Sequence, residues 1–185
     1  MIDSQLRTSG VNDAYILERM NAVARERFVP PAAGGHAYID RAIALGEGRF
    51  LAAPAVHAAM LQQARPCLTD RALVVDGGSG YLPELLAPLV GSLAVMSPDE
   101  ALAGSGGAQD GGFTLVMIDG AVEVLPAALI RRLAPGARVV TGWLRGTVTC
   151  LATGREAAGE VALVALAEIG IPVLPEFAAP QGWSF

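Results

Sequence analysis

The sequence predicts an α/β fold with a doubly wound, mostly parallel sheet and antiparallel strands at its C-terminal edge. From residue 70 onward, short apolar runs alternate with helical segments, which is the pattern of parallel strands buried on both faces. A glycine-rich turn at residues 76–80 follows the first of these runs, a position typical of ligand loops. The last third carries strand-like segments with no helix between them, which favours antiparallel pairing.

The composition is that of a globular chain with a full core. The chain has 185 residues, of which 52% are hydrophobic and 17% are charged. No internal repeat or linker-like segment divides it, so we expect one domain over residues 1–185. Within this domain, residues 1–65 are expected to form an N-terminal helical cap and residues 70–185 the α/β core.

The charge pattern argues against nucleic-acid binding. The formal net charge is −5, and all 13 basic residues are arginines. Arg25, Arg27, Arg131 and Arg132 form small clusters that acidic neighbours dilute, and we expect these four side chains on the solvated surface. Nonspecific binding to nucleic acid would need cations gathered on one face.

Other sequence features limit where the protein is expected to be located and whether it is expected to bind a metal. No apolar run approaches the roughly 20 residues that a membrane-spanning helix needs. The first ten residues lack the pattern of a signal peptide. We therefore expect a cytoplasmic protein with no membrane partner. The two cysteines and two histidines have no metal-ligand spacing, so no metal site is expected.

The first 65 residues contain two helical patterns. One runs from Asp13, an N-cap candidate, to about residue 23, with apolar residues at helical spacing. The other begins at Pro54, since proline is favoured in the first helical turn, and runs to about residue 64. Between them, residues 45–48 form a passage rich in turn residues.

The core alternates predicted strands and helices. Strands are predicted at 72–75, 93–96, 113–118 and 137–143. Helices are predicted at 82–90, 98–103 and 127–133. The final antiparallel strands are expected at 147–153 and 161–169.

Residues 76–80 read Asp-Gly-Gly-Ser-Gly and lie between the first core strand and the next helix. Glycine lets a backbone approach a ligand closely, and a helix N-terminus favours anions. A purely structural turn is the alternative. Asp119 ends the third core strand, so it is either a ligand contact or a turn residue. We expect His57 to be a hydrogen-bonded, partly buried side chain rather than a catalytic base.

Motifs along nearly the whole chain resemble those of the protein-L-isoaspartate O-methyltransferases, a family that uses S-adenosylmethionine. The likeness includes the family's opening segments, its active-site loop, its cofactor loop and a later strand–helix–strand unit. The segments that carry it are 3–7 (DSQLR), 10–13 (GVND), 25–30 (RERFVP), 37–40 (AYID), 45–46, 51–54 (LAAP), 72–80, 113–122 with Pro126, and 133–140.

The resemblance implies a Rossmann-like fold and methyl transfer from S-adenosylmethionine to the isoaspartyl carboxylate of damaged proteins. An isoaspartyl-containing peptide or protein would then be the partner. The resemblance puts the catalytic position at Ala52 and the substrate loop at Ala53 and Pro54. The implied cofactor-binding residues are Asp76, Gly77, Gly78, Ser79, Gly80, Ser97 and Asp119.

Three of these positions depart from the family's pattern. Ala52 stands where the family has a serine, so a positioning hydroxyl is lost. Asp76 replaces the first glycine of the cofactor loop, which narrows the backbone's approach and adds a negative charge near the carboxylate of a methionine moiety. Ser97 replaces the acid that would bind two ribose hydroxyls, with Asp99 as a nearby substitute.

The connection at residues 98–112 is a fourth departure. It has room for one short helix and a glycine-rich return, so one strand and one helix of the family fold are expected to be missing. The adenine side of the pocket would then be open. We therefore expect cofactor binding and methyl transfer to be weak or lost. The alternative is a noncatalytic protein of this fold that binds a protein or peptide, and a third idea is a different ligand in the altered pocket.

Overall fold

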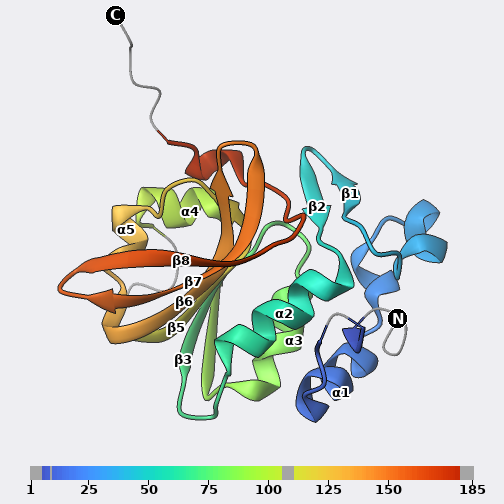
Figure 1. Cartoon of the computed structure of the whole chain (residues 1–185), viewed down its shortest axis with the longest axis horizontal. Helices are drawn as coiled ribbons and strands as arrows, with labels where there is room; N and C mark the ends of the chain where they lie inside the picture. Colours follow the sequence, from blue (N-terminus) through green and yellow to red (C-terminus); the bar gives the residue numbers. More distant parts are fainter. Residues whose placement is uncertain (1–5, 9, 106–110, 180–185) are drawn as a thin grey trace, which may run out of the picture.

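The computed structural model describes residues 6–8, 10–105 and 111–179 (Figure 1). Asp3, Ser4 and Gln5 of the opening motif lie outside the described residues, as do Gly106 and Gly107 of the 98–112 connection.

The described residues form a mixed sheet of six strands in the order β4-β3-β5-β6-β7-β8. The first four strands in this order pair in parallel, and β6, β7 and β8 pair antiparallel. This arrangement confirms the predicted α/β class with its antiparallel C-terminal edge. The strands are β3 (Arg71–Val75), β4 (Ser92–Met96), β5 (Phe113–Val122), β6 (Leu133–Arg145), β7 (Val148–Ala157) and β8 (Glu160–Glu168).

Helices cover both faces of the sheet (Figure 1). Alternate residues of β3 belong to two different apolar clusters, Val74 to the one that includes α1, α2 and α3, and Val75 to the one with α4 and α5. This alternation is the period of two that a strand imposes on its side chains. The helices are α1 (Ala14–Ala22), α2 (Pro54–Ala64), α3 (Tyr81–Leu86), α4 (Pro98–Ala103) and α5 (Ala127–Ile130), with short 3-10 helices η2 (Arg25–Phe28), η3 (Pro31–His36), η4 (Ala87–Leu89) and η5 (Pro175–Phe177).

The 98–112 connection leaves β4 at the edge of the sheet. The chain leaves β4 through α4, as predicted, and returns to β5 beside β3. Within the described residues no strand lies beyond β4. The edge of the sheet next to the glycine-rich turn is therefore formed by β4 itself.

Three local predictions need correction. The turn expected within 45–48 is confined to residues 47–48, and it joins β1 (Ile43–Gly46) to β2 (Arg49–Leu51), two strands that are too short to show a strand period. The helix predicted at 127–133 ends at Ile130, because Leu133 already pairs with Phe113 in the sheet. Asp13 is the N-cap of α1, but its side chain makes no capping hydrogen bond.

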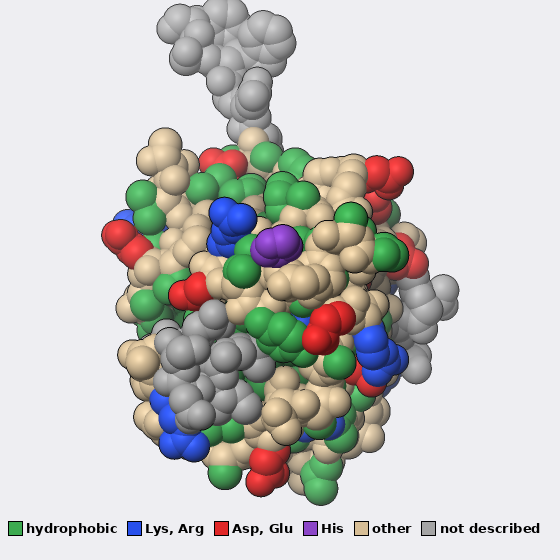
Figure 2. Space-filling model, turned by 90° about the vertical axis from the view of Figure 1, so that its right-hand side faces the viewer, with side chains coloured by type: hydrophobic (Ala, Val, Ile, Leu, Met, Phe, Trp, Pro, Cys, Tyr) green, Lys and Arg blue, Asp and Glu red, His purple; other side chains and the backbone are tan. Residues whose placement is uncertain are grey.

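The surface that faces the viewer in Figure 2 carries acidic and basic side chains scattered singly among apolar and polar ones. Cations are not gathered into a stripe on this face. None of the described helices is both long and apolar enough to cross a membrane.

Gly77 supports the fold by letting two chain segments touch. A Cβ atom added to Gly77 would lie 2.1 Å from the backbone oxygen of Asp119, which lies within β5 because this strand continues past the predicted end at residue 118 to Val122. We expect Gly77→Ala to lower the free energy of unfolding by about 2–3 kcal/mol, because the backbone of β5 cannot yield as a flexible side chain would. Urea unfolding measures this change.

Gly34→Ala is the matched control, since a Cβ atom at Gly34 meets nothing within 4 Å. Its free energy of unfolding should change by less than about 1 kcal/mol. Equal effects of the two substitutions would contradict the packing argument.

Candidate functional site

Residues 76–80, called the glycine loop from here on, connect β3 to α3 at the carboxyl end of the parallel strands. Gly77 lies against the backbone of Asp119. Gly80 is the N-cap of α3 and has φ 69°, a left-handed conformation that glycine adopts readily. The loop therefore lies where ligands bind in sheets of this type.

Asp76 closes the glycine loop with its own side chain. Its Oδ1 accepts a hydrogen bond from the backbone N–H of Gly80 at 2.9 Å. Burial raises the pKa of Asp76, the negative charge of Asp119 raises it further, and backbone hydrogen bonds from Gly80 and Gly78 oppose both effects. An N–H group that an open loop would offer to a ligand is thus bound internally.

Asp119 and Ser79 join the loop to β5. The Ser79 hydroxyl donates to Oδ2 of Asp119 at 3.1 Å, and the same hydroxyl oxygen accepts from the backbone N–H of Tyr81 at 3.1 Å. Asp119 is 6% exposed, so it is not a simple surface turn residue. Its role in the structure is to hold the loop and the cap together.

His57 on α2 connects Asp119 to the N-terminal cap. Its Nε2 lies 2.9 Å from Oδ1 of Asp119, and its Nδ1 lies 3.5 Å from a guanidinium nitrogen of Arg25. Because Arg25 can only donate, Nδ1 accepts, and Nε2 carries the proton that it donates to the carboxylate. The prediction of a hydrogen-bonded histidine is confirmed, but the side chain is completely buried rather than partly so.

Arg25 is also completely buried, which corrects the expectation of a solvated surface position. Its Nε donates to the backbone oxygen of Ala37 at 2.8 Å and its Nη2 to that of Ala52 at 2.7 Å. The guanidinium lies 4.8 Å from the centre of the Tyr81 ring. Burial lowers the pKa of Arg25. No signal in the sequence separates Arg25 from the exposed Arg27 two residues later.

Arg132 needs the same correction, since it is 9% exposed. Its Nη2 donates to the backbone oxygens of Gly104 and Ser105 at 2.8 and 2.9 Å. Arg27 and Arg131 are exposed, as predicted. Backbone carbonyls that satisfy a guanidinium allow it to leave water, and such partners are visible only in the folded chain.

Ala52 lies next to the Arg25 side chain at the start of α2. It is 2% exposed and presents a methyl group, while its carbonyl oxygen is held by Arg25. Ala53 is the N-cap of α2 and makes no side-chain capping bond, and Pro54 occupies the first helical turn, as predicted. Ala53 also lines an apolar groove of about 700 Å³ together with Phe50, Ile171 and Val173.

Ser97 serves the fold at the start of α4. Its hydroxyl oxygen accepts from the backbone N–H of Glu100, while the Glu100 carboxylate accepts from the backbone N–H and the hydroxyl of Ser97. This capping box occupies both side chains. Ser97, Glu100, Asp76, Gly78 and Arg49 line a hollow of about 320 Å³ beside the glycine loop.

Arg49 of β2 covers the other side of the glycine loop. Its Cβ, Cγ and Cδ atoms lie 3.1–3.3 Å from where a Cβ of Gly78 would be. Its guanidinium forms an ion pair with Glu176 of η5. Sequence reasoning singled out neither residue, because they are 127 positions apart and meet only in the folded chain.

The His57 contact should be among the strongest supports of the fold. Substituting His57 by alanine leaves the Asp119 carboxylate and the Arg25 guanidinium buried with fewer partners, so we expect a loss of about 3–5 kcal/mol in the free energy of unfolding. Urea unfolding measures it. His36→Ala, at the exposed histidine, is the control and should change stability by less than about 0.5 kcal/mol. Similar losses at both histidines would disprove the role of His57.

The raised pKa of Asp76 predicts a pH dependence. The folded state binds the proton of Asp76 more tightly than the unfolded chain does, so stability falls as pH rises from the unfolded pKa of about 3.9 through the raised folded pKa. Asp76→Asn keeps an oxygen for the Gly80 N–H and removes the charge.

The stability gain of Asp76→Asn over the natural chain should therefore grow between pH 4 and pH 8. Urea unfolding at several pH values, with the exposed Asp99→Asn as control, checks this expectation. A gain that stays constant with pH would speak against a raised pKa at Asp76.

Comparison with known proteins places this chain in a family. Residues 1–102 match the family described as Protein-L-isoaspartate(D-aspartate) O-methyltransferase (PCMT). The protein-L-isoaspartate O-methyltransferase of Roseiflexus castenholzii is 36% identical over 108 residues, which cover 58% of this chain and 49% of that relative. Protein-L-isoaspartate O-methyltransferase 2 of an Anaeromyxobacter species is 33% identical over 162 residues, 76% of this chain and 67% of the relative.

A solved structure supports the same fold. It is described as a protein-L-isoaspartate O-methyltransferase from Plasmodium falciparum in complex with S-adenosyl-L-homocysteine. The TM-score is 0.72 at 18% identity, and the match covers 92% of this chain and 95% of that chain. Because the family match extends over more than half of the sequence and aligned relatives exceed 30% identity, this chain belongs to the protein-L-isoaspartate O-methyltransferase family.

Proposed function

We propose that methyl transfer from S-adenosylmethionine to an isoaspartyl carboxylate is weak or lost in this member of the family. The observation that carries the proposal is the closure of the glycine loop by Asp76, whose carboxylate binds the Gly80 N–H. Asp119 lies close enough to raise the pKa of Asp76, so two carboxylates meet at this loop. A ligand that brings its own carboxylate would meet like charges there.

The described residues fit S-adenosylmethionine poorly. Its methionine end has an ammonium group, which Asp76 could accept, and a carboxylate, for which a cation is needed. Arg49 is the one cation among the described residues of the neighbouring hollow, and it is paired with Glu176. The ribose hydroxyls would need a free acid, but Glu100 is engaged in the capping box with Ser97.

The position of Ala52 supports weak activity for a second reason. An isoaspartyl carboxylate is already ionised at neutral pH, so its methylation depends on positioning and on electrostatics rather than on a strong base. Ala52 has no hydroxyl with which to orient that carboxylate. Its carbonyl oxygen accepts a hydrogen bond from Arg25.

The second candidate function is noncatalytic binding of a peptide or protein. The apolar groove of about 700 Å³ at Ala53 favours this reading. Its rim includes Phe50 and Val173, which are 40% and 41% exposed, and Arg41 and Asp40 add charges of both signs. Such a groove could hold an extended segment without any cofactor.

Calorimetric titration with S-adenosylmethionine and S-adenosylhomocysteine tests the primary proposal. We expect a Kd weaker than about 1 mM for both, because the loop groups are already satisfied internally. Asp76→Gly should strengthen binding at least about tenfold, since it removes the charge and frees the Gly80 N–H. Glu160→Gly, at an exposed acid that begins β8 on the opposite edge of the sheet, is the control and should leave binding unchanged.

A methyl-transfer assay with an isoaspartyl peptide completes this test. The natural chain should show little or no transfer, and Asp76→Gly combined with Ala52→Ser should transfer more than either single variant. Micromolar cofactor binding and rapid transfer by the natural chain would overturn the proposal. Binding of the isoaspartyl peptide without cofactor, measured by fluorescence anisotropy, would support the noncatalytic alternative.

A further inference from the structure

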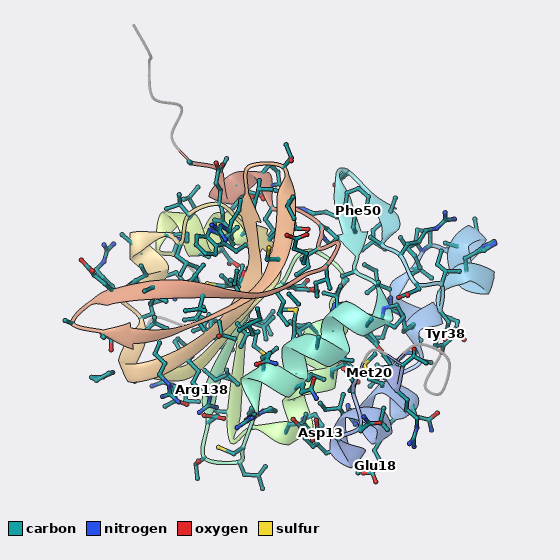
Figure 3. The ribbon with its side chains drawn as sticks, viewed as in Figure 1. Asp13, Glu18, Met20, Tyr38, Phe50 and Arg138 are labelled. Carbon is teal, nitrogen blue, oxygen red and sulfur yellow. The ribbon has the colours of Figure 1, made fainter. Side chains whose placement is uncertain are left out.

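A second hollow lies at the opposite end of the parallel strands from the glycine loop. It has a volume of about 430 Å³ and is lined by Arg65 after α2, Arg138 of β6 and Arg155 of β7, with Val140 and Val164 as apolar walls. Figure 3 shows Arg138 beside the C-terminal end of α2, where its Nε donates to the backbone oxygen of Ala64 at 3.2 Å. We call this region the arginine hollow.

The strand register forces two of these arginines onto one face. Arg138 of β6 lies directly opposite Arg155 of β7, and Val140 lies directly opposite Thr153, one step further along the same face. Side chains of directly opposite residues are separated by about 5 Å at Cβ. Like charges in this arrangement repel each other, and the Asp70 carboxylate beside Arg138 offsets part of this repulsion.

Only one of the three charges is neutralised. Arg138 forms an ion pair with Asp70 at 2.6 Å. Burial opposes ionisation of Asp70, but hydrogen bonds from Cys67 and Thr114 and the charge of Arg138 lower its pKa, so Asp70 remains a carboxylate committed to these partners. The structure thus compensates Arg138 from within.

Arg155 and Arg65 are not compensated in this way. Arg155 donates to the backbone oxygen of Gly136 at 3.3 Å. The backbone N–H of Arg65 donates to the oxygen of Leu61 at 3.1 Å, and the Arg65 side chain also borders a second hollow that Asp13 and Tyr15 line. No carboxylate is among the described residues that line the arginine hollow, so neither Arg155 nor Arg65 has a carboxylate partner within its lining.

The backbone at Arg65 gives an independent indication. Arg65 is the C-cap of α2 and has φ 44°, in the left-handed region where helices usually carry glycine or asparagine. The left-handed backbone conformation costs free energy at a residue with a side chain such as arginine, and strained residues of this kind are frequent at functional sites. The conformation sends the chain into β3 while keeping the Arg65 side chain at the hollow.

We propose that the arginine hollow binds the phosphate group of a small phosphomonoester. Two guanidinium groups without a carboxylate partner in the lining match the two negative charges of this group, and the planar fork of arginine suits its oxygens. The Thr153 hydroxyl adds a further donor at the hollow. A volume of about 430 Å³ exceeds what one phosphate fills, and Val140 and Val164 offer apolar contact for an organic substituent. Inorganic phosphate has the same negatively charged oxygens and could be recognised by the same groups.

Thermal unfolding and calorimetry at pH 8 and constant ionic strength test the proposal with phenyl phosphate, inorganic phosphate and sodium chloride. At ten times its Kd, a phosphate ligand should raise Tm by about 3–5 °C above the chloride sample. Tighter binding of phenyl phosphate would assign the site to a phosphomonoester, and equal binding would assign it to free phosphate. No rise above the chloride sample with either probe would overturn the proposal.

Two variants separate anion binding from stability. Arg155→Gln should remove the phosphate-dependent rise in Tm. Arg65→Gly relieves the left-handed strain, so it should keep or raise Tm in chloride while also losing the phosphate-dependent rise. Arg131→Gln, at an exposed arginine that does not line the hollow, should retain it. An undiminished rise in Arg155→Gln and Arg65→Gly would place the bound phosphate elsewhere and refute the assignment.

Discussion

A single buried hydrogen-bonded line, from Arg25 through His57 to Asp119, joins the N-terminal cap to the sheet and to the glycine loop. Arg25 and Asp119 carry opposite charges, and the imidazole of His57 lies between them. It accepts a hydrogen bond from Arg25 and donates one to Asp119. Burial of these charges is tolerable because each also has a second partner, Ala52 for Arg25 and Ser79 for Asp119. The positions of α2, of Ala52 and of the loop relative to β5 all depend on this line.

The same internal pairing of polar groups is the basis of the proposal that this member of the family binds the cofactor weakly. The polar groups around the glycine loop already have protein partners: Gly80 is bound by Asp76, Ser97 by Glu100, and Arg49 by Glu176. A ligand entering there would have to break protein hydrogen bonds before forming its own, which reduces the net gain from each new contact. The fold retains the place of a cofactor loop while the side chains compete for its hydrogen-bonding groups.

The arginine hollow shows the contrasting situation at the other end of the strands. There the antiparallel extension of β7 and β8 carries Arg155 beside Arg138, and the turn after α2 adds Arg65. Charges that lack internal partners point to a counter-ion from outside, whereas satisfied charges point to a structural role. The two regions therefore differ in which groups remain available to bind a ligand.

The sequence by itself determined the α/β class, the order of the core elements and the family, because strand and helix periods and short motifs are local properties that need no knowledge of distant contacts. It also predicts that Asp76, Ser97 and Ala52 depart from the family's pattern. Only the tertiary structure decided that Arg25 and His57 are buried, that Ser97 is a helix cap, and that Arg49 meets Glu176. Whether a polar side chain is buried, and what it binds there, depends on partners brought together from separate elements, which local sequence patterns do not specify.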